Sequence, residues 1–454
     1  MTPLDDFTIG LLGVGLLIVL VLSGMRVYVA AAIAGFTGLV LLKGWGPAAA
    51  IVGTIPHSKT VTYTLSVLPL FSLIGFLAFY SGLTKRLFEA ARRWLGWVPG
   101  GLAVSTVFAS AGFAAVSGAS TATAAVFSRT AIPDMLRHGY KPSLTAGVIA
   151  AGGTLASLIP PSAILVVYAI IVEQSVGKLL LAGLLPGLVS VLVYVILIVS
   201  MCCVKPELGR SITDVTWKQR FVSLPGVLPI VLVVLTIFGA LYTGFASPTE
   251  AGALGAAIVF VIFVGKSFLQ GSFKDFRRNL RETLMETAKL TVMIFTLIWG
   301  VFIFVRFLGF ATLPETFTSW IVSLDVSPLL IMICILLAYA ILGMFMDAIG
   351  MLILTLPVVF PAVIALGYDP IWFGIIVVKM AEICLITPPI GLNCFVVAGV
   401  SRELSSATGH SMAIPLQDVY KGVLPFFVAD IATVAILLVF PGIVLWLPNT
   451  MLVN

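Results

Sequence analysis

Two pairs of adjacent prolines, Pro160-Pro161 and Pro388-Pro389, lie inside long apolar stretches of the chain. Proline lacks a backbone N–H and clashes with the preceding helical turn, so each pair should break a helix and free several backbone carbonyls. In a bilayer such groups are tolerated only inside the protein or beside a water-filled cavity. A broken helix presents carbonyl oxygens at one half-helix end, which suit a cation, and N–H groups at the other, which suit an anion. The two breaks are therefore predicted to form an ion-binding centre.

Residues with oxygen ligands surround the two breaks. Ser162 follows the first pair, and Thr387, Gly391 and Asn393 flank the second. Asp347 lies upstream of the second pair in an apolar segment, and its charge would cost about 2.5–3.5 kcal/mol at the bilayer centre, which favours a functional role. Oxygen donors of this kind are the ligands that a hard cation such as Na⁺ prefers.

The two breaks belong to an internal repeat with an offset of 228 residues, from Pro160 to Pro388. At the same offset, Gly-Tyr-Lys-Pro at 139–142 matches Gly-Tyr-Asp-Pro at 367–370. Proline and glycine residues that interrupt helices recur at matching positions over this length, which indicates that the two halves of the chain have equivalent structures.

Charged residues give the two halves opposite orientations. Basic residues flank the segment 98–132 on both sides, so the positive-inside rule places both ends in the cytoplasm. That segment should be a re-entrant hairpin with its turn near 117–120. Acidic residues flank the matching segment 328–360, which should enter from the other side with its turn near 343–347. The repeats are therefore predicted to be inverted, an architecture of secondary transporters.

The composition places these elements in a membrane. Of the 454 residues, 60% are hydrophobic and 10% are charged, whereas a soluble domain carries about 25% charged residues. Apolar blocks at 7–22, 179–203, 224–240 and 424–444 approach the length that crosses a hydrocarbon core of about 30 Å. All such blocks together give roughly eleven crossings or part-crossings. The predicted fold is one all-α polytopic membrane domain with two inverted repeats, each holding a re-entrant hairpin and a broken transmembrane helix.

Other functions fit these residues less well. The net charge of +6 reflects cytoplasmic loops and does not indicate a nucleic-acid partner. No ring-type repeat of filter residues indicates a channel. Asp347 and Asp369 could form an aspartyl dyad, but the charge pattern places Asp369 in an outer loop, so we expect no enzyme activity. Lys379 and Glu382, three residues apart on one helix, should pair, either as a structural contact or as part of a gate.

Several ordered motifs carry a resemblance to a known family. Ser-Gly-Ala-Ser-Thr-Ala-Thr-Ala at 117–124 and Ile-Pro-Pro-Ser at 159–162 lie in the first half, and Ile-Thr-Pro-Pro-Ile-Gly-Leu-Asn at 386–393 lies in the second. With Pro-Thr-Glu-Ala at 248–251, and over essentially the whole chain, they resemble the large membrane subunit of tripartite ATP-independent periplasmic (TRAP) transporters. Ala119 stands where many relatives carry a second Ser, which weakens the case for a side-chain ligand there.

The resemblance implies an elevator-type carrier, coupled to Na⁺, for a small organic acid anion in the bacterial inner membrane. It implies a mobile transport domain made of residues 98–175 and 326–401. Residues 1–97, 176–325 (with amphipathic connectors) and 402–454 would form the scaffold. Besides membrane lipid, the implied partners are a small four-helix membrane subunit and a periplasmic substrate-binding protein. A stand-alone ion-coupled dicarboxylate carrier with the same fold is the alternative.

The resemblance also implies a set of site residues at the hairpin turns and helix breaks. The expected Na⁺ ligands are Ser117, Gly118, Ser120, Pro160, Gly343, Asp347, Thr387, Pro388 and Gly391. The expected substrate contacts are Thr121, Thr123, Pro161, Ser162, Pro389 and Asn393. Backbone carbonyls are expected to supply much of the Na⁺ binding.

Overall fold

The computed structural model describes residues 5–212, 215–270, 273–344, 346, 348–408 and 412–451. These residues form helices joined by short connections, with no β-strand among them. The α-helices, in chain order, are α1 (Asp6–Leu22), α2 (Val27–Lys43), α3 (Trp45–Thr60), α4 (Val67–Tyr80), α5 (Leu83–Leu95), α6 (Gly101–Ser117), α7 (Ser120–Arg137), α8 (Pro142–Leu158), α9 (Ala163–Ile171), α10 (Val176–Val204), α11 (Trp217–Ser223), α12 (Leu228–Thr243), α13 (Pro248–Gln270), α14 (Phe273–Phe310), α15 (Leu313–Ser323), α16 (Pro328–Gly343), α17 (Ala348–Ala365), α18 (Pro370–Cys384), α19 (Leu392–Thr408), α20 (Leu416–Val439) and α21 (Gly442–Asn449).

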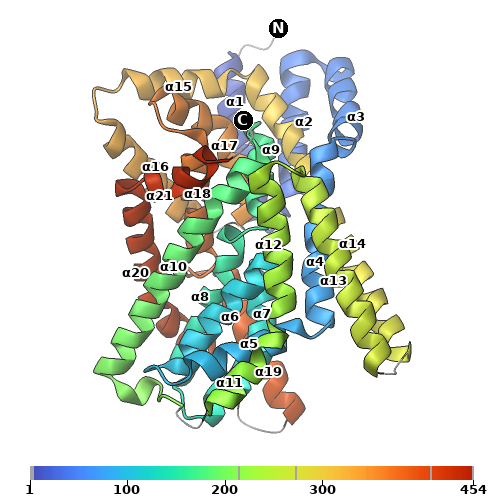
Figure 1. Cartoon of the computed structure of the whole chain (residues 1–454). Coiled ribbons are helices and arrows are strands. Elements are labelled where there is room, and N and C mark those ends of the chain that lie inside the picture. Colours follow the sequence, from blue (N-terminus) through green and yellow to red (C-terminus); the bar gives the residue numbers. More distant parts are fainter. Residues whose placement is uncertain are drawn as a thin grey trace.

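The helices are suited to a membrane. Within the described residues, six are long and apolar enough to cross a bilayer, and up to eight spans result if each of two bent helix pairs counts as one. Four shorter apolar helices, α1, α2, α6 and α16, add to these. Figure 1 shows the helices packed side by side, with the first helices, α1 and α2, in the upper part of the view. The predicted all-α polytopic fold is confirmed.

The helix order of the second half repeats that of the first. The hairpin α6–α7, the broken pair α8–α9 and the long α10 are followed later by α16–α17, α18–α19 and α20. Both turns fall where they were predicted, at Gly118-Ala119 and after Gly343. In Figure 1, α6 and α7 lie in the lower half and α16 and α17 in the upper half. This arrangement agrees with opposite entry, and the inverted symmetry of the halves stays a prediction.

The two diprolines interrupt helices as predicted. α8 ends at Leu158, and α9 begins at Ala163 with a bend of 42° between them. α18 ends at Cys384, and α19 begins at Leu392. The peptide bonds Pro160-Pro161 and Pro388-Pro389 are both cis.

Two of the apolar blocks are not single helices. The block 424–444 is divided between α20, which begins at Leu416, and α21, because Pro441 lies between them and has no N–H to continue the helix. The block 224–240 begins with a 3₁₀ turn, Leu224–Gly226, before α12 starts. Apolar composition alone predicted the segments but not the interruptions that proline imposes.

Four helices surround the region between the two breaks. α20 packs along α8, while α10 contacts both α18 and α20. The first halves of the two broken helices, α8 and α18, also contact each other. The four helices α8, α10, α18 and α20 therefore form one packed unit, and the predicted division into transport and scaffold domains stays a prediction.

Candidate functional site

The turn of the first hairpin lies directly against the first helix break. Gly118, just after α6, has a positive φ of 61°. A Cβ built on Gly118 would lie 2.2 Å from the Pro161 carbonyl oxygen, so only glycine fits. Ser120 Oγ, at the start of α7, hydrogen-bonds to Ser157 Oγ in the last turn of α8. The structure thus brings the predicted turn and break residues together.

The hydroxyl groups at this turn and break serve the local backbone. Ser117 Oγ and Thr123 Oγ1 are hydrogen-bonded at 3.2 Å, and Thr123 Oγ1 also donates to the Ala119 carbonyl at 2.9 Å. Ser162 Oγ donates to the Ser157 carbonyl and accepts a hydrogen bond from the backbone of α9 at 3.3 Å, which caps that helix. The first hairpin turn and the first break together are called the first half-site, and the second hairpin turn and break the second. At the first half-site, backbone carbonyls are therefore more available to a cation than the side-chain hydroxyls.

Two of the predicted residues lie apart from these contacts. Thr121 is exposed on α7. The ring of Pro160 faces α10, because a Cβ built on Gly183 would lie 3.4 Å from Pro160 Cγ. Since a proline ring carries no ligand atom, Pro160 could contribute only its backbone carbonyl.

The chain after the second break folds back on the end of α18. The backbone N–H of Asn393 donates to the Leu385 carbonyl at 3.0 Å. Thr387 Oγ1 donates to the Ile383 carbonyl at 2.6 Å, and Gly391 has a positive φ of 50°. The predicted residues Thr387, Gly391 and Asn393 therefore share one compact turn.

The two prolines of the second break are more exposed than those of the first. Pro388 and Pro389 are both exposed, whereas Pro160 and Pro161 are buried. The hydroxyl of Tyr420, on α20, donates to the Pro389 carbonyl at 2.9 Å. That carbonyl has a partner within the protein, as a break inside a membrane requires.

The second hairpin also meets its break. A Cβ built on Gly343, at the end of α16, would lie 1.6 Å from the sulfur of Cys384, the last residue of α18. Asp347 lies outside the described residues, so its position relative to the break stays a prediction.

Asn393 links the two half-sites. Its side-chain Nδ2 donates to the Ala150 carbonyl of α8 at 3.0 Å. A Cβ on Gly153, one turn further along α8, would lie 3.0 Å from both Asn393 Nδ2 and the Ser120 carbonyl oxygen. The buried Asn393 Oδ1 has no hydrogen-bond partner among the described residues. The second break, the first broken helix and the first hairpin thus meet at one place.

A cavity of about 200 Å³ adjoins the first hairpin turn. Its lining includes Ser117 and Ala122 from the hairpin, with Arg129 from α7 and Glu286 from α14. Arg129 is more than half exposed and forms an ion pair with Glu403 of α19, with 3.2 Å between Nη2 and Oε2. A guanidinium at the wall of a cavity beside a helix break can bind a carboxylate.

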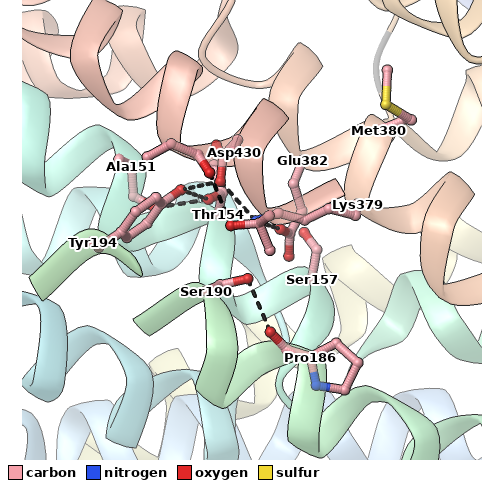
Figure 2. Close-up of polar contacts among 12 residues, drawn as sticks. Ala151, Thr154, Ser157, Pro186, Ser190, Tyr194, Lys379, Met380, Glu382 and Asp430 are labelled. Carbon is pink, nitrogen blue, oxygen red and sulfur yellow. Dashed lines mark hydrogen bonds and ion pairs between the residues drawn. The ribbon is translucent and has the colours of Figure 1, made fainter. Parts of the chain in front are cut away.

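The predicted Lys379–Glu382 pair exists and belongs to a larger cluster. Lys379 Nζ lies 2.8 Å from Glu382 Oε2 and 2.7 Å from Asp430 Oδ1. Figure 2 shows these side chains gathered with Tyr194 in the interior. Asp430 and Tyr194 come from α20 and α10, distant in sequence from α18.

Arg129 and Asp430 were not among the residues predicted from the sequence. For Arg129 a signal was present, because Ala122, Val126 and Arg129 recur at the spacing of one helical face. For Asp430 the signal was its place inside the apolar block 424–444, where an ionised side chain needs a partner.

Comparison with known proteins identifies the family. Residues 14–443 match the family model described as "Tripartite ATP-independent periplasmic transporter, DctM component". A C4-dicarboxylate TRAP transporter large permease protein of Pseudomonas aeruginosa is 35% identical over 85% of this chain and 86% of its own length. Its counterpart in Vibrio cholerae is 32% identical over 97% of this chain and 98% of its own. Other relatives, at 29% identity, are named for sialic acid or for 2,3-diketo-L-gulonate.

The fold also resembles that of a solved transporter. The YdaH transporter of Alcanivorax borkumensis aligns with a TM-score of 0.61 over 88% of this chain and 90% of that one, at 15% identity. That likeness concerns the fold, whereas the family match covers nearly all of the helices described above. The resemblance drawn from the sequence motifs is confirmed: the chain belongs to the DctM family of TRAP transporters, as a large permease protein of the inner membrane and not an enzyme.

Proposed function

We propose that this chain carries out Na⁺-coupled uptake of a small organic acid anion by an elevator movement. The observation that carries the proposal is the contact of the first hairpin turn with the first break, at Gly118 and Pro161, with Asn393 of the second break at the same place. Half-helix ends that meet in the protein interior combine cation-binding carbonyls with anion-binding N–H groups.

The first Na⁺ would bind at the first hairpin turn and break. Ser117, Gly118, Ser120 and Pro160 are the expected contributors, mainly through backbone carbonyls, because the hydroxyls there already have partners. Hard oxygen donors fit Na⁺, and the absence of a side chain on Gly118 lets the hairpin turn approach the Pro161 carbonyl.

The second Na⁺ would bind between the second hairpin and its break. The expected contributors are Gly343, Asp347, Thr387, Pro388 and Gly391. The compact turn that holds Thr387 and Gly391 supports this assignment, and Asp347 would add a negative charge. Each net positive charge that moves inward gains about 2.3 kcal/mol per 100 mV, so coupled Na⁺ offsets the cost of importing an anion.

The transported anion would be a small carboxylate, with C4-dicarboxylates as the first class to test. The two most similar relatives named above are C4-dicarboxylate permeases. Arg129 at the cavity beside the first hairpin offers a bidentate partner for one carboxylate. Asn393, whose Oδ1 has no partner among the described residues, and the exposed Thr121 are the best placed of the predicted substrate contacts. Thr123, Pro161, Ser162 and Pro389 would contribute through the shape of the turns.

Two protein partners complete the proposed system. A periplasmic binding protein would deliver the anion, and a small four-helix membrane subunit would pack on the lipid-facing helices. The family assignment supports both partners. Exposed apolar side chains such as Leu235 on α12 and Val292 on α14 also support the membrane subunit.

The deciding experiment is uptake of a labelled C4-dicarboxylate into proteoliposomes. We expect accumulation only when the large permease, its small subunit and the binding protein are all present and when Na⁺ is higher outside. Accumulation without a Na⁺ gradient would contradict the coupling. Accumulation by the large permease alone would instead favour the stand-alone carrier.

A further inference from the structure

A closed cluster of ionisable side chains lies where α18, α20 and α10 meet (Figure 2). Lys379 Nζ contacts Glu382 Oε2 at 2.8 Å and Asp430 Oδ1 at 2.7 Å. The Tyr194 hydroxyl donates to the same Asp430 Oδ1 at 2.7 Å. The four side chains are fully buried, and each has a solvent exposure of 0%. The cluster is thus sealed from solvent within the packed helices.

The cluster has one negative charge too many when Lys379, Glu382 and Asp430 are ionised and Tyr194 is neutral. It contains one ammonium group and two carboxylates, which leaves a net charge of −1. Two of its oxygens, Glu382 Oε1 and Asp430 Oδ2, have no hydrogen-bond partner among the described residues. An uncompensated ion in a protein interior is strongly unfavourable, so a cation is expected to neutralise the charge.

The surrounding helices supply no second positive charge. From α8, Thr154 Oγ1 lies 3.4 Å from the Tyr194 hydroxyl and donates to the Ala151 carbonyl at 2.7 Å. From α10, Ser190 donates to its own helix, at the Pro186 carbonyl. Among the described residues, the charged groups that act on the cluster are its own Lys379, Glu382 and Asp430.

The contacts decide which carboxyl group takes up a cation. Asp430 Oδ1 accepts hydrogen bonds from the side chains of both Lys379 and Tyr194. Glu382 has one side-chain partner, Lys379, and it also interacts with the backbone of Leu158 at the end of α8. Glu382 therefore has fewer side-chain donors than Asp430, so a proton on Glu382 displaces fewer side-chain hydrogen bonds. We propose that Glu382 is a proton-binding site that holds one proton in the folded protein at neutral pH.

A proton on Glu382 would balance the charge of the cluster. The cluster then contains one cation, one anion and one neutral acid, so its net charge is zero. A protonated carboxyl group is a hydrogen-bond donor, and Asp430 Oδ2 is an acceptor in the same cluster that lacks a donor. Because all the atoms are closely packed and buried, a proton is the cation that fits without opening the helices.

The cluster contains none of the residues that are proposed to bind Na⁺. At the repeat offset, Lys379 and Glu382 match Ala151 and Thr154 of α8, which carry no charge. The charged members of the cluster, Lys379, Glu382 and Asp430, therefore all come from the second half of the chain, and α10 of the first half adds Tyr194. The proposal does not depend on Na⁺ coupling, and its test requires no transport.

The direct test is infrared spectroscopy of the purified full-length protein in detergent. The carbonyl stretch of a buried protonated carboxyl group should be present at neutral pH in the wild type and lost in Glu382→Gln. It should also be lost in Asp430→Asn, because Glu382 would then be the single anion beside Lys379. It should persist in Glu403→Gln, which neutralises an exposed carboxylate of a surface ion pair. A wild-type band that survives Glu382→Gln overturns the proposal.

A second measurement follows the pH dependence of thermal unfolding. If the folded state holds a proton that the unfolded chain has lost, stability falls as pH rises from mildly acidic to mildly alkaline values. Glu382→Gln should flatten this decline, and Glu403→Gln should leave it unchanged. A decline of equal slope in wild type and Glu382→Gln would contradict the proposal. So would a stabilisation by Na⁺, at constant ionic strength, that Glu382→Gln removes, because the bound cation would then be Na⁺.

Discussion

Gly118 lies so close to Pro161 that a methyl group cannot be placed between them. A Cβ on Gly118 would lie 2.2 Å from the Pro161 carbonyl oxygen, and the backbone of Gly118 has a positive φ of 61°. The turn of a hairpin and the break of a helix therefore meet backbone to backbone. Two carbonyl-rich segments held this close are the simplest basis for a cation site in the interior.

Gly118→Ala should damage both stability and Na⁺-dependent uptake. Overpacking costs about 1–3 kcal/mol, and a side chain in the left-handed region adds about 1–2 kcal/mol. The methyl group would separate the turn from the break, so the Na⁺ concentration for half-maximal uptake should rise. Thermal unfolding and uptake at varied Na⁺ measure the two effects.

Gly139→Ala is the matched control for that change. Gly139 has a positive φ of 76°, but a Cβ there would meet nothing within 4 Å. It therefore shares the backbone strain without the close approach. An equal shift in Na⁺ dependence for the two variants would show that Gly118 acts through strain and not through its contact with the break.

Much of the architecture could be predicted because proline and glycine act locally. The diprolines at 160–161 and 388–389 break helices wherever the chain places them, and the turn near Gly118 follows from a polar stretch between apolar segments. The loop charges also predict the orientation of each hairpin, and that orientation stays a prediction. None of these inferences required knowledge of which helices pack together.

The side-chain network could not be predicted because it depends on packing between distant helices. Asp430 lies 51 positions after Lys379 and on another helix, yet their charged atoms are 2.7 Å apart. Periodicity predicted only the pair within one helix, Lys379 and Glu382. In the same way, nothing in the sequence places Asn393 against Ala150, since that contact joins the two halves of the chain.

Asn393→Leu should weaken the junction of the two half-sites. The substitution keeps the approximate size but removes the hydrogen bond from Nδ2 to the Ala150 carbonyl, which joins the second break to α8. A hydrogen bond contributes about 0.5–1.5 kcal/mol, so the unfolding midpoint should fall and the KM for substrate should rise. Ser128→Ala is the control, since its hydroxyl is equally buried but bonds within its own helix. A midpoint for Asn393→Leu equal to that of Ser128→Ala would argue against a special role for the junction.

Asp347→Ala should raise the Na⁺ concentration needed for uptake. A carboxylate near the second break would supply one negative ligand, and its removal weakens cation binding more than it affects the substrate. Uptake in the three-component proteoliposomes, measured at varied Na⁺ and saturating substrate, tests this. Asp325→Ala, at an exposed position before the second hairpin, is the control. An unchanged Na⁺ dependence would remove Asp347 from the site.

Arg129→Met should raise the KM for a carboxylate substrate about ten-fold or more, since a hydrogen bond to a charged group contributes about 1.5–3 kcal/mol. The maximal transport rate should change less than the KM. The proposed contact between Arg129 and the substrate stabilises the bound state and does not drive the proposed elevator movement. Glu403→Gln releases Arg129 from its ion pair and should leave the KM equal or lower. If Glu403→Gln raises the KM as much as Arg129→Met does, the ion pair itself matters and Arg129 does not contact the substrate.

Lys379→Met should destabilise the folded protein strongly, because it leaves two buried acids without their cation. Removing one partner of a buried ion pair costs about 3–5 kcal/mol. Adding Asp430→Asn to Lys379→Met should restore part of this loss, since the remaining Glu382 can stay neutral. Lys421→Met, which removes an exposed pair with Asp418 on α20, should leave the denaturant midpoint close to that of the wild type. If the double variant is less stable than Lys379→Met, the charge balance of the cluster does not control its stability, and the cost lies in lost packing and hydrogen bonds.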